Sequence, residues 1–467
     1  MHTCETLIIG AGLTGLSCAF HLGRDHLLVE KENEPGGLVR TRRRPTDPEA
    51  RARCGEFLCD GTGHWLHLRT PEMRALVERL LPGQLIEHER RAVIHLAGAF
   101  TPYPFQANTY GLPREIVLDC LLGLIRARHP EDFGLQPPDH PPRHFRESLE
   151  RLFGAGICRH FMVPYNEKLL GVPLEEISPT YAERFIPRPS LEDVVKGALG
   201  FSRESLGYNA KFVYPRAGGI GALSRALADA LPQPPRYNAE VRSVHLRTKT
   251  ARVTVRNPSV TANASTTATS EQVVRFERLV NTMSLPEFVA RIEDAPENLR
   301  AAAARLRATT VHYFDVGVRG PGDAASQYHW IYFPEPQFVF YRVGSYSAVH
   351  ADAAPPGCRS YYVEMSGGDA RALLGQPEAL RTRVLDDLRR ARVLGPNDEV
   401  LFMELCRIPN AYVIFDAHYE SARREVIETL AAHGVHSCGR WGGWNYGGME
   451  DALLEGRAAA AVLRETA

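Results

Sequence analysis

The feature that most constrains this chain is a glycine-rich turn that joins an apolar run to a helical pattern near the N-terminus. The run Thr6–Ile9 predicts a strand, and the pattern Leu16–Leu22 predicts a helix. Between them, Gly10 permits a tight turn, Gly12 allows the backbone to approach a pyrophosphate, and Gly15 allows the helix to pack closely on the strand. The phosphates would lie on the free N–H groups at the start of the helix.

A carboxylate follows at the position where such a site needs one. The next apolar run, His26–Val29, ends in Glu30. This is about twenty residues after the turn, where a carboxylate accepts a hydrogen bond from a ribose hydroxyl. A glycine-rich turn alone is a weak signal, and Glu30 could also be a solvated strand end. Strand, turn, helix and carboxylate together predict a βαβ site for a dinucleotide.

A second pair of glycines favours FAD over NAD. The segment Glu34–Thr41 (EPGGLVRT) is similar to the second glycine pair, basic residue and hydroxyl residue of amine oxidase-like flavoproteins, in which FAD lies extended through the protein. It predicts cofactor contacts at Gly37 and Arg40. Arg40 could equally be a surface charge beside the arginines at 42–44.

Two further segments predict contacts with a flavin. The turn that contains Gly63 and precedes Trp65 would let the backbone approach a flat ring, and His64 could either serve the cofactor or be a structural histidine. Near the C-terminus, a glycine-rich stretch opens the alanine-rich helix 452–465. Its free N–H groups would close over the cofactor at Gly448 and Met449.

The composition excludes several classes of protein. A chain of 467 residues suits two or three domains. Lys plus Arg equals Asp plus Glu at 55 each, so no net field favours nucleic acid or an anionic membrane surface. The nine cysteines are scattered without a CxxC pair, which favours reduced thiols and gives no metal-ligand spacing. No signal-peptide pattern and no run of eighteen apolar residues occurs, so we expect a cytoplasmic protein without a membrane partner.

The order of the periodic segments predicts an α/β fold. We expect a Rossmann-like FAD-binding domain with an inserted helical domain and an antiparallel β-sheet domain. Residues 45–59 read as a loop, and residues 337–343 read as one strand of the antiparallel sheet. The predicted domains are three parts of an FAD-binding domain (1–100, 206–300 and 401–467), a helical substrate domain (101–205) and an antiparallel sheet domain (301–400).

Beyond these signals, the sequence resembles the UDP-galactopyranose mutase family, and its eukaryotic branch more than its bacterial one. The matching pieces span nearly the whole chain and keep the family's order. They are GAGLTGL, GGLVRT, GTGHW, YPFQ, FMVPYNEK, AERF, YNAKFVYPRAGG, WIYFPEP, FVFYR and GRWGGWNY.

The resemblance implies a UDP-sugar site. The residues at the family's uridine positions, which stack on the base or bind its edge through amides, are Tyr103, Phe105, Gln106, Phe161, Tyr165 and Asn166. Those at its sugar and diphosphate positions are Asn209, Trp330, Tyr332, Tyr412, Arg440 and Tyr446. The family's three catalytic positions fall on Arg184, Arg342 and His64. The two arginines would bind the diphosphate, although they could also be ordinary ion-paired arginines. His64 would lie beside the flavin.

The chain departs from the family's pattern at three places. The tryptophan after the PYN segment is Leu170, the basic residue within it is Val163, and the stretch after Tyr446 lacks the usual run of asparagine, glutamine and aspartate. These changes put the identity of the hexose in doubt more than that of the nucleotide.

The resemblance implies an isomerase that interconverts UDP-galactopyranose and UDP-galactofuranose for cell-surface glycan synthesis. FAD, reduced by NADPH or NADH, would attack the anomeric carbon through N5, hold the sugar while its ring opens and recloses, and return it to UDP. The rival reading is an FAD-dependent oxidase or desaturase of the amine oxidase and protoporphyrinogen oxidase-like group. A flavin-containing scaffold without catalysis is a third. The sequence leaves the oligomeric state open, homo-oligomers included.

Overall fold

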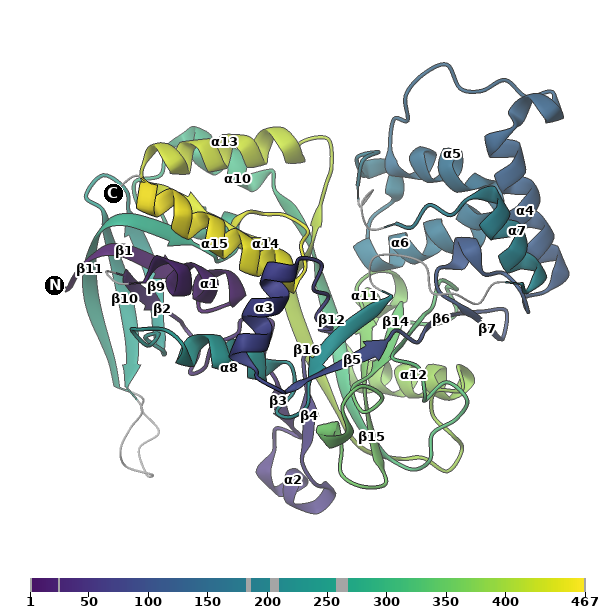
Figure 1. Ribbon diagram of the computed structural model, residues 1–467, viewed down its shortest axis with the longest axis horizontal. Helices are drawn as coiled ribbons and strands as arrows, with labels where there is room; N and C mark the ends of the chain where they lie inside the picture. Colours follow the sequence, from purple (N-terminus) through teal and green to yellow (C-terminus); the bar gives the residue numbers. More distant parts are fainter. Residues whose placement is uncertain (1, 24–25, 182–185, 202–209, 258–267, 466–467) are drawn as a thin grey trace.

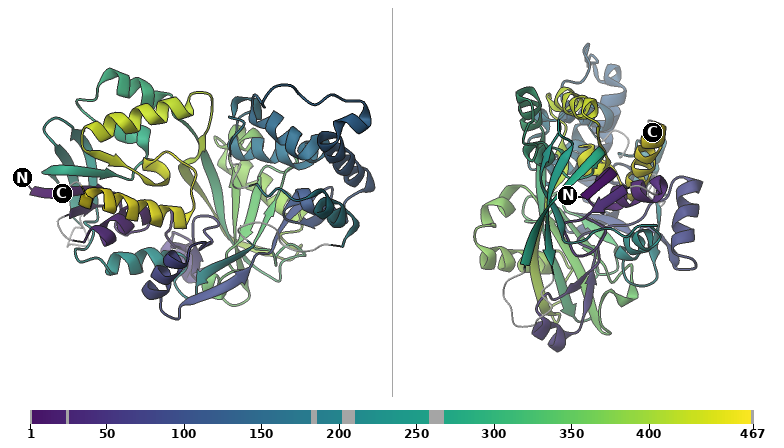
Figure 2. Two further views of the ribbon diagram at one scale, coloured as in Figure 1. Left: turned by 45° about the horizontal axis from the view of Figure 1, so that its top comes forward. Right: turned by 90° about the vertical axis from the view of Figure 1, so that its left-hand side faces the viewer.

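Two large sheets and a lobe of helices make up the protein. The computed structural model describes residues 2–23, 26–181, 186–201, 210–257 and 268–465. The first sheet lies at one end, the second sheet lies in the middle, and the helical lobe stands beyond the second sheet (Figure 1). Both termini lie at the end remote from the helical lobe (Figure 2).

The first sheet is a parallel nucleotide-binding sheet with an antiparallel extension. Strand β1 is parallel to β2 and to β11, and β17 is parallel to β11, whereas β9, β10 and the first half of β11 form an antiparallel meander. The strands are β1 (His2–Ile9), β2 (His26–Val29), β9 (Ala239–His245), β10 (Thr250–Asn257), β11 (Ala268–Asn281) and β17 (Val435–Ser437).

Helices cover both faces of this sheet, which explains why its central strands are continuous apolar runs. On β1, Ile8 points toward one layer of helices, while Leu7 and Ile9 point toward the other. The first layer contains α1 (Leu13–Leu22), α8 (Gly221–Asp229) and α15 (Met449–Glu465). The second contains α9 (Leu285–Ala290), α10 (Glu297–Ala304) and α13 (Tyr419–Ala432).

The second sheet has seven strands and is antiparallel except where β13 runs parallel to β6. Helix α12 (Pro377–Arg390) packs on one face through Leu380, Val384 and Leu388. In spatial order the strands are β16 (Glu399–Ile414), β12 (Arg307–Arg319), β15 (Cys358–Met365), β14 (Arg342–Ser345), β13 (Trp330–Tyr332), β6 (Ala92–Leu96) and β7 (Ala99–Pro102).

The described part of the helical lobe contains four α-helices, two of which cross at close range. A Cβ on Gly156 of α5 would lie 2.1 Å from the backbone oxygen of Asp119 in α4, so only glycine permits this crossing. Gly154 interrupts α5 at φ +77°, a conformation that glycine adopts readily. The helices are α4 (Arg114–Arg128), α5 (Phe145–Ile157), α6 (Val163–Leu170), which follows a π-helical turn at Cys158–Met162, and α7 (Leu191–Leu199).

Two local predictions are wrong. The predicted loop 45–59 contains a helix, α2 (Pro48–Cys54), because Asp47 caps the N–H groups of Glu49 and Ala50 and proline occupies the first helical position. In the predicted strand 337–343 only the last two residues are extended, as part of β14. The preceding carbonyl groups instead bind the side chain of Lys168.

The remaining elements are short. Strands β3 and β4 form a ribbon, as do β5 and β8. They are β3 (Arg42–Arg44), β4 (Phe57–Cys59), β5 (Leu85–Glu89), β8 (Lys211–Pro215), α3 (Pro71–Leu80), α11 (Gly368–Leu373), α14 (Gly439–Gly442), and 3-10 turns at Phe105–Ala107, Pro130–Phe133, Leu174–Glu176 and Ala351–Ala353. Among the described residues, no helix combines the length and the apolarity that crossing a lipid bilayer requires.

Candidate active site

The glycine-rich turn after β1 has the geometry that its three glycines predict. Gly10 adopts φ +100°, a conformation that side chains disfavour. A Cβ on Gly15 would lie 1.9 Å from the backbone oxygen of Gly10, so α1 packs too closely for any side chain there. Around Gly12, in contrast, no protein atom lies within 4 Å of such a Cβ. The open side of the turn therefore leaves room for a ligand to approach the backbone.

Glu30 is part of this turn and not a solvated strand end. It is 7% exposed, and its carboxylate accepts hydrogen bonds from the backbone N–H groups of Ala11 (2.7 Å) and Glu32 (3.0 Å). Each carboxylate oxygen has a second lone pair. Glu30 can therefore fasten the turn and still accept from a hydroxyl in the adjoining cavity.

The second glycine pair lies against the first. A Cβ on Gly37, at φ +60°, would lie 3.3 Å from the Cα of Gly12. The side chain of Arg40 is not a free surface charge, because its Nε donates to the backbone oxygen of Gly37 (2.9 Å) and its Nη1 lies 3.6 Å from Glu32. Arg40 thus stabilises the turn that precedes it.

Two neighbouring cavities, of about 330 and 380 Å³, run along these turns. Glu30 and Arg40 line the larger one, while His64 and Arg342 line the smaller one. Both cavities share Gly12, Gly37, Leu38, Thr282, Ile408 and Trp441 in their walls, so together they form one elongated space. An extended dinucleotide has the shape that such a space can hold.

The turn that carries His64 is fixed at its start by Asp60, which is 1% exposed. The Asp60 carboxylate accepts from the hydroxyls of Thr41 (2.7 Å) and Tyr214 and from the N–H of Ile220 (3.3 Å). Burial raises the pKa of Asp60 to about 6 despite these donors. Its backbone oxygen lies 3.0 Å from Nδ1 of His64.

His64 is neutral at physiological pH. Burial lowers its pKa to about 4, and the positive charges of Arg440 and Arg342 add to this. Because a carbonyl oxygen can only accept, Nδ1 carries the proton that binds Asp60, and Nε2 is left with a lone pair. His64 lines the smaller cavity, and Nε2 has no hydrogen-bond partner among the described residues.

Three adjacent strands place charged and aromatic side chains beside this cavity. Arg342 on β14 is in register with Tyr332 on β13 and with Glu364 on β15. Glu364 is 2% exposed and forms a two-point ion pair with Arg342, through Nε and through Nη2 at 2.9 Å. Nη2 also lies 3.4 Å from the hydroxyl of Tyr412, which leaves Nη1 of Arg342 as the donor toward the cavity.

Arg440 stabilises the neighbouring part of the cavity wall. Its guanidinium donates to the backbone oxygens of Gly447 (2.8 Å) and Ala411 (2.5 Å). It also lies over the rings of Tyr446 (5.0 Å) and Tyr412 (5.7 Å), which stack on each other at 5.8 Å. These two tyrosines line the cavity.

An aromatic cluster adjoins the Arg342 side of the cavity. Phe161 stacks between Phe105 (5.1 Å) and Tyr165 (5.2 Å), and Tyr165 meets the edge of Tyr332 at 5.2 Å. Tyr332 stacks in turn on Tyr103 at 5.2 Å. Trp330 lies parallel to Trp65 at 6.2 Å, beside the same cluster. The structure therefore brings together in this cluster six of the eight aromatic residues that were assigned to the nucleotide and sugar, while the other two, Tyr412 and Tyr446, stack on each other beside Arg440.

The two predicted amides lie at this cluster but are bound to the chain itself. Gln106 is 2% exposed and donates from Nε2 to the backbone oxygen of Pro187 (2.7 Å). Asn166 donates from Nδ2 to the backbone oxygen of Met162 (2.6 Å). Each amide keeps its carbonyl oxygen as an acceptor for another group.

Comparison with known proteins identifies the family. The sequence model of a family described as flavin containing amine oxidoreductase matches residues 13–464. The chain belongs to this family.

Solved structures share the fold of this chain. The crystal structure of reduced UDP-galactopyranose mutase has a TM-score of 0.85 at 24% identity, over 100% of this chain and 95% of that one. Putrescine oxidase bound to putrescine has a TM-score of 0.64 at 17% identity, over 99% of each chain. Cyclohexylamine oxidase from Brevibacterium oxydans IH-35A has a TM-score of 0.60 at 18% identity, again over 99% of each. The predicted α/β flavoprotein fold is confirmed.

Two buried acidic residues beside the site were not predicted from the sequence. Glu364 directly follows three apolar or aromatic residues of β15, and Asp60 directly follows β4, and an acidic residue in such a place is a usable signal for a buried, partnered charge. Gly448 and Met449, which were predicted to contact the cofactor, both line the cavity. The backbone N–H of Gly448 is not free for a ligand, because it donates to Asp451 (2.7 Å). Arg184 and Asn209 lie outside the described residues.

Proposed function

We propose that this chain is an FAD-dependent mutase that interconverts the pyranose and furanose forms of a UDP-sugar, with UDP-galactose as the first candidate. The observation that carries the proposal is the register of β13, β14 and β15, which sets Tyr332, Arg342 and Glu364 side by side. This places an aromatic cluster and a guanidinium next to the cavity that His64 lines. A flat base needs ring faces, and a diphosphate needs a cation.

The residues present fit FAD. The bare backbone at Gly12, the buried carboxylate of Glu30 and the elongated double cavity suit the pyrophosphate, the ribose and the length of the cofactor. When bound and reduced by NADPH or NADH, the flavin supplies the nucleophile for the anomeric carbon. Ring exchange leaves substrate and product at the same oxidation level, so no net oxidant is consumed.

The chain's own side chains bind and orient in this scheme. Arg342 donates from Nη1 to the departing and returning diphosphate, while Glu364 fixes the plane of its guanidinium. Tyr412, Tyr446 and Arg440 form a wall that limits water. The Phe105, Phe161 and Tyr165 stack provides the aromatic surface for uracil, with the carbonyl oxygens of Gln106 and Asn166 as acceptors.

The fold comparison also supports this function over amine oxidation. The TM-score to the mutase is 0.85, against 0.64 and 0.60 for the putrescine and cyclohexylamine oxidases. An oxidase remains the second candidate because the family is that of flavin containing amine oxidoreductases. The proposal includes a cytoplasmic location and the three-domain division predicted from the sequence.

The test is turnover by dithionite-reduced protein with UDP-galactofuranose and related UDP-furanoses, followed by chromatography of both ring forms. We expect conversion in the reduced state only. Arg342→Lys should lower the rate roughly 100-fold while the flavin spectrum is kept, since lysine lacks the planar fork. Arg319→Lys, on the exposed end of β12, is the matched control and should convert normally. Flavin reduction by amines without any UDP-sugar conversion would establish the oxidase instead.

A further inference from the structure

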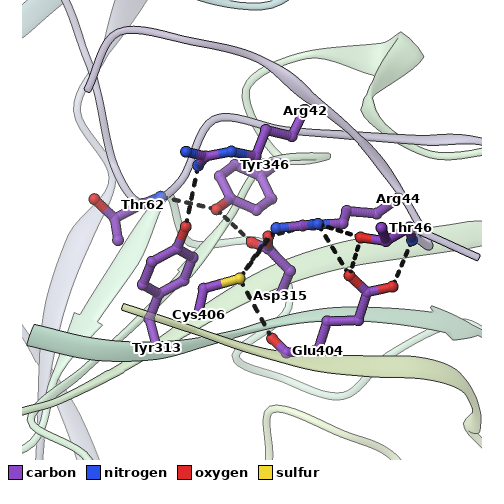
Figure 3. A network of polar contacts seen from close by, with 9 residues as sticks. All are labelled: Arg42, Arg44, Thr46, Thr62, Tyr313, Asp315, Tyr346, Glu404 and Cys406. Atoms are coloured by element: carbon purple, nitrogen blue, oxygen red, sulfur yellow. Dashed lines mark hydrogen bonds and ion pairs between the residues drawn. The ribbon is translucent and has the colours of Figure 1, made fainter. Parts of the chain in front are cut away.

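A buried polar network lies behind the turn that carries His64. It connects β3, β12, β16 and the residue after β14 to the backbone of the turn (Figure 3). The residues are Arg42, Arg44, Thr46, Thr62, Tyr313, Asp315, Tyr346, Glu404 and Cys406. None of the residues that the resemblance assigned to cofactor or substrate belongs to it, so its role is not explained by the proposed site.

One chain of hydrogen bonds within this network ends at the turn. The N–H of Thr62 donates to the hydroxyl of Tyr346 (2.9 Å), and that hydroxyl donates to Oδ1 of Asp315 (2.9 Å). Oδ2 of Asp315 accepts from Nε of Arg44 (2.9 Å). Asp315 has no solvent exposure, and Tyr346 is 2% exposed. A buried, fully paired chain of this kind has one low-energy arrangement.

The conformation of the turn requires stabilising contacts from residues outside it. Thr62 has φ +101°, a conformation that a residue with a side chain rarely adopts. Its neighbour Gly61 is packed against the network as well, because a Cβ there would lie 2.9 Å from Nη1 of Arg42 and 3.1 Å from the hydroxyl of Tyr313. The backbone oxygen of Thr62 in turn accepts from the N–H of His64 (3.0 Å).

We propose that Tyr346 and Asp315 are positioning residues for His64. Through the N–H of Thr62 they fix the turn, so that Nδ1 of His64 donates to the backbone oxygen of Asp60 and the Nε2 lone pair is presented to the cavity. The inference rests only on the flavin-binding part of the proposed function and not on the UDP-sugar. In this proposal the buried network keeps one hydrogen-bond acceptor, Nε2 of His64, in place beside the cofactor.

The test is the midpoint potential of the bound flavin in purified holoprotein. Reduced flavin carries a proton on N5 that oxidised flavin lacks, so an acceptor held in the cavity favours the reduced state. Tyr346→Phe, which removes one oxygen atom, should therefore shift the potential to a more negative value. Tyr361→Phe is the matched control, because Tyr361 is 1% exposed and its hydroxyl has no hydrogen-bond partner in the part of the chain that the structure describes. It should leave the potential unchanged.

A double-mutant comparison separates positioning from a general structural effect. In a His64→Ala background the Tyr346→Phe shift should disappear, since the group that it positions is gone. A shift of the same size in both backgrounds, or no shift in either, would overturn the proposal. Protein without flavin absorbance would refute the proposed function as well, and this is seen before any potential is measured.

The wild-type protein gives a second test, in which a variant serves only to assign the signal of His64. Long-range ¹H–¹⁵N spectra of histidine-labelled protein at pH 7 should contain a neutral imidazole protonated at Nδ1 that is missing from His64→Ala. An Nε2-protonated tautomer for His64 would contradict the assigned geometry directly.

Discussion

Lys168 is the side chain whose removal should most clearly test how the helical lobe is attached to the second sheet. From α6, its Nζ reaches the backbone oxygens of Phe333 (2.9 Å), Glu335 (3.0 Å), Phe338 (2.9 Å) and Phe340 (2.7 Å). These carbonyls belong to the segment between β13 and β14, which lies between Tyr332 and Arg342 in the chain. One ammonium group therefore holds a loop that the proposed site depends on.

The expected cost of Lys168→Met follows from these contacts. Burial lowers the pKa of Lys168 to about 7, so the ammonium is fully formed below that pH. The ammonium has three protons, and each hydrogen bond to a charged group contributes about 1.5–3 kcal/mol. Methionine fills similar space but donates none of them, and partial hydration of the freed carbonyls offsets part of the loss. We expect the free energy of unfolding to fall by about 3–5 kcal/mol, at the upper end for one substitution.

Equilibrium unfolding in urea, followed by tryptophan fluorescence, measures this loss, and calorimetric titration with UDP measures the effect on the site. The affinity for UDP should weaken because Tyr332 and Arg342 flank the released loop. Lys196→Met is the matched control: Lys196 lies on α7, and among the described residues its ion pair is with Glu192 on the same exposed helix surface (2.6 Å). Equal unfolding midpoints for the two variants would refute the role assigned to Lys168.

Two further predictions follow from the glycine turn and from His64. Gly15→Ala should destabilise the protein even without flavin, because its Cβ would meet the backbone of Gly10. Gly12→Ala should leave the stability of the apoprotein unchanged and weaken only flavin binding. Thermal melts of both apoproteins and flavin titrations check these outcomes. For His64, a folded-state pKa of about 4 lies below the value of 6.5 expected when unfolded, so its contribution to stability is complete above pH 6.5 and is lost as the pH falls toward 4. The wild type should therefore lose more stability than His64→Gln between pH 7 and 5, and parallel urea-midpoint curves would contradict the shift.

The sequence by itself determined the local geometry of the nucleotide turn. Gly10, Gly12 and Gly15 have distinct steric roles that follow from spacing alone, because a strand–turn–helix unit is built from contacts within about twenty residues. The hairpin from β6 to β7 is local in the same way, since Ala97 and Gly98 form its two-residue turn. Such features depend on neighbours in the chain and are visible in it.

The tertiary structure alone decided which side chains meet across strands. Glu364 faces Arg342 only because β14 and β15 pair in that register, and Tyr346 reaches Thr62 across 284 residues of sequence. The sequence pattern of residues 337–343 predicts a strand, but tertiary contacts prevent most of this segment from forming one, because Lys168 binds backbone carbonyl groups there. Burying a charge or a polar group requires a partner from whichever segment lies nearest in space, and sequence spacing does not specify that segment.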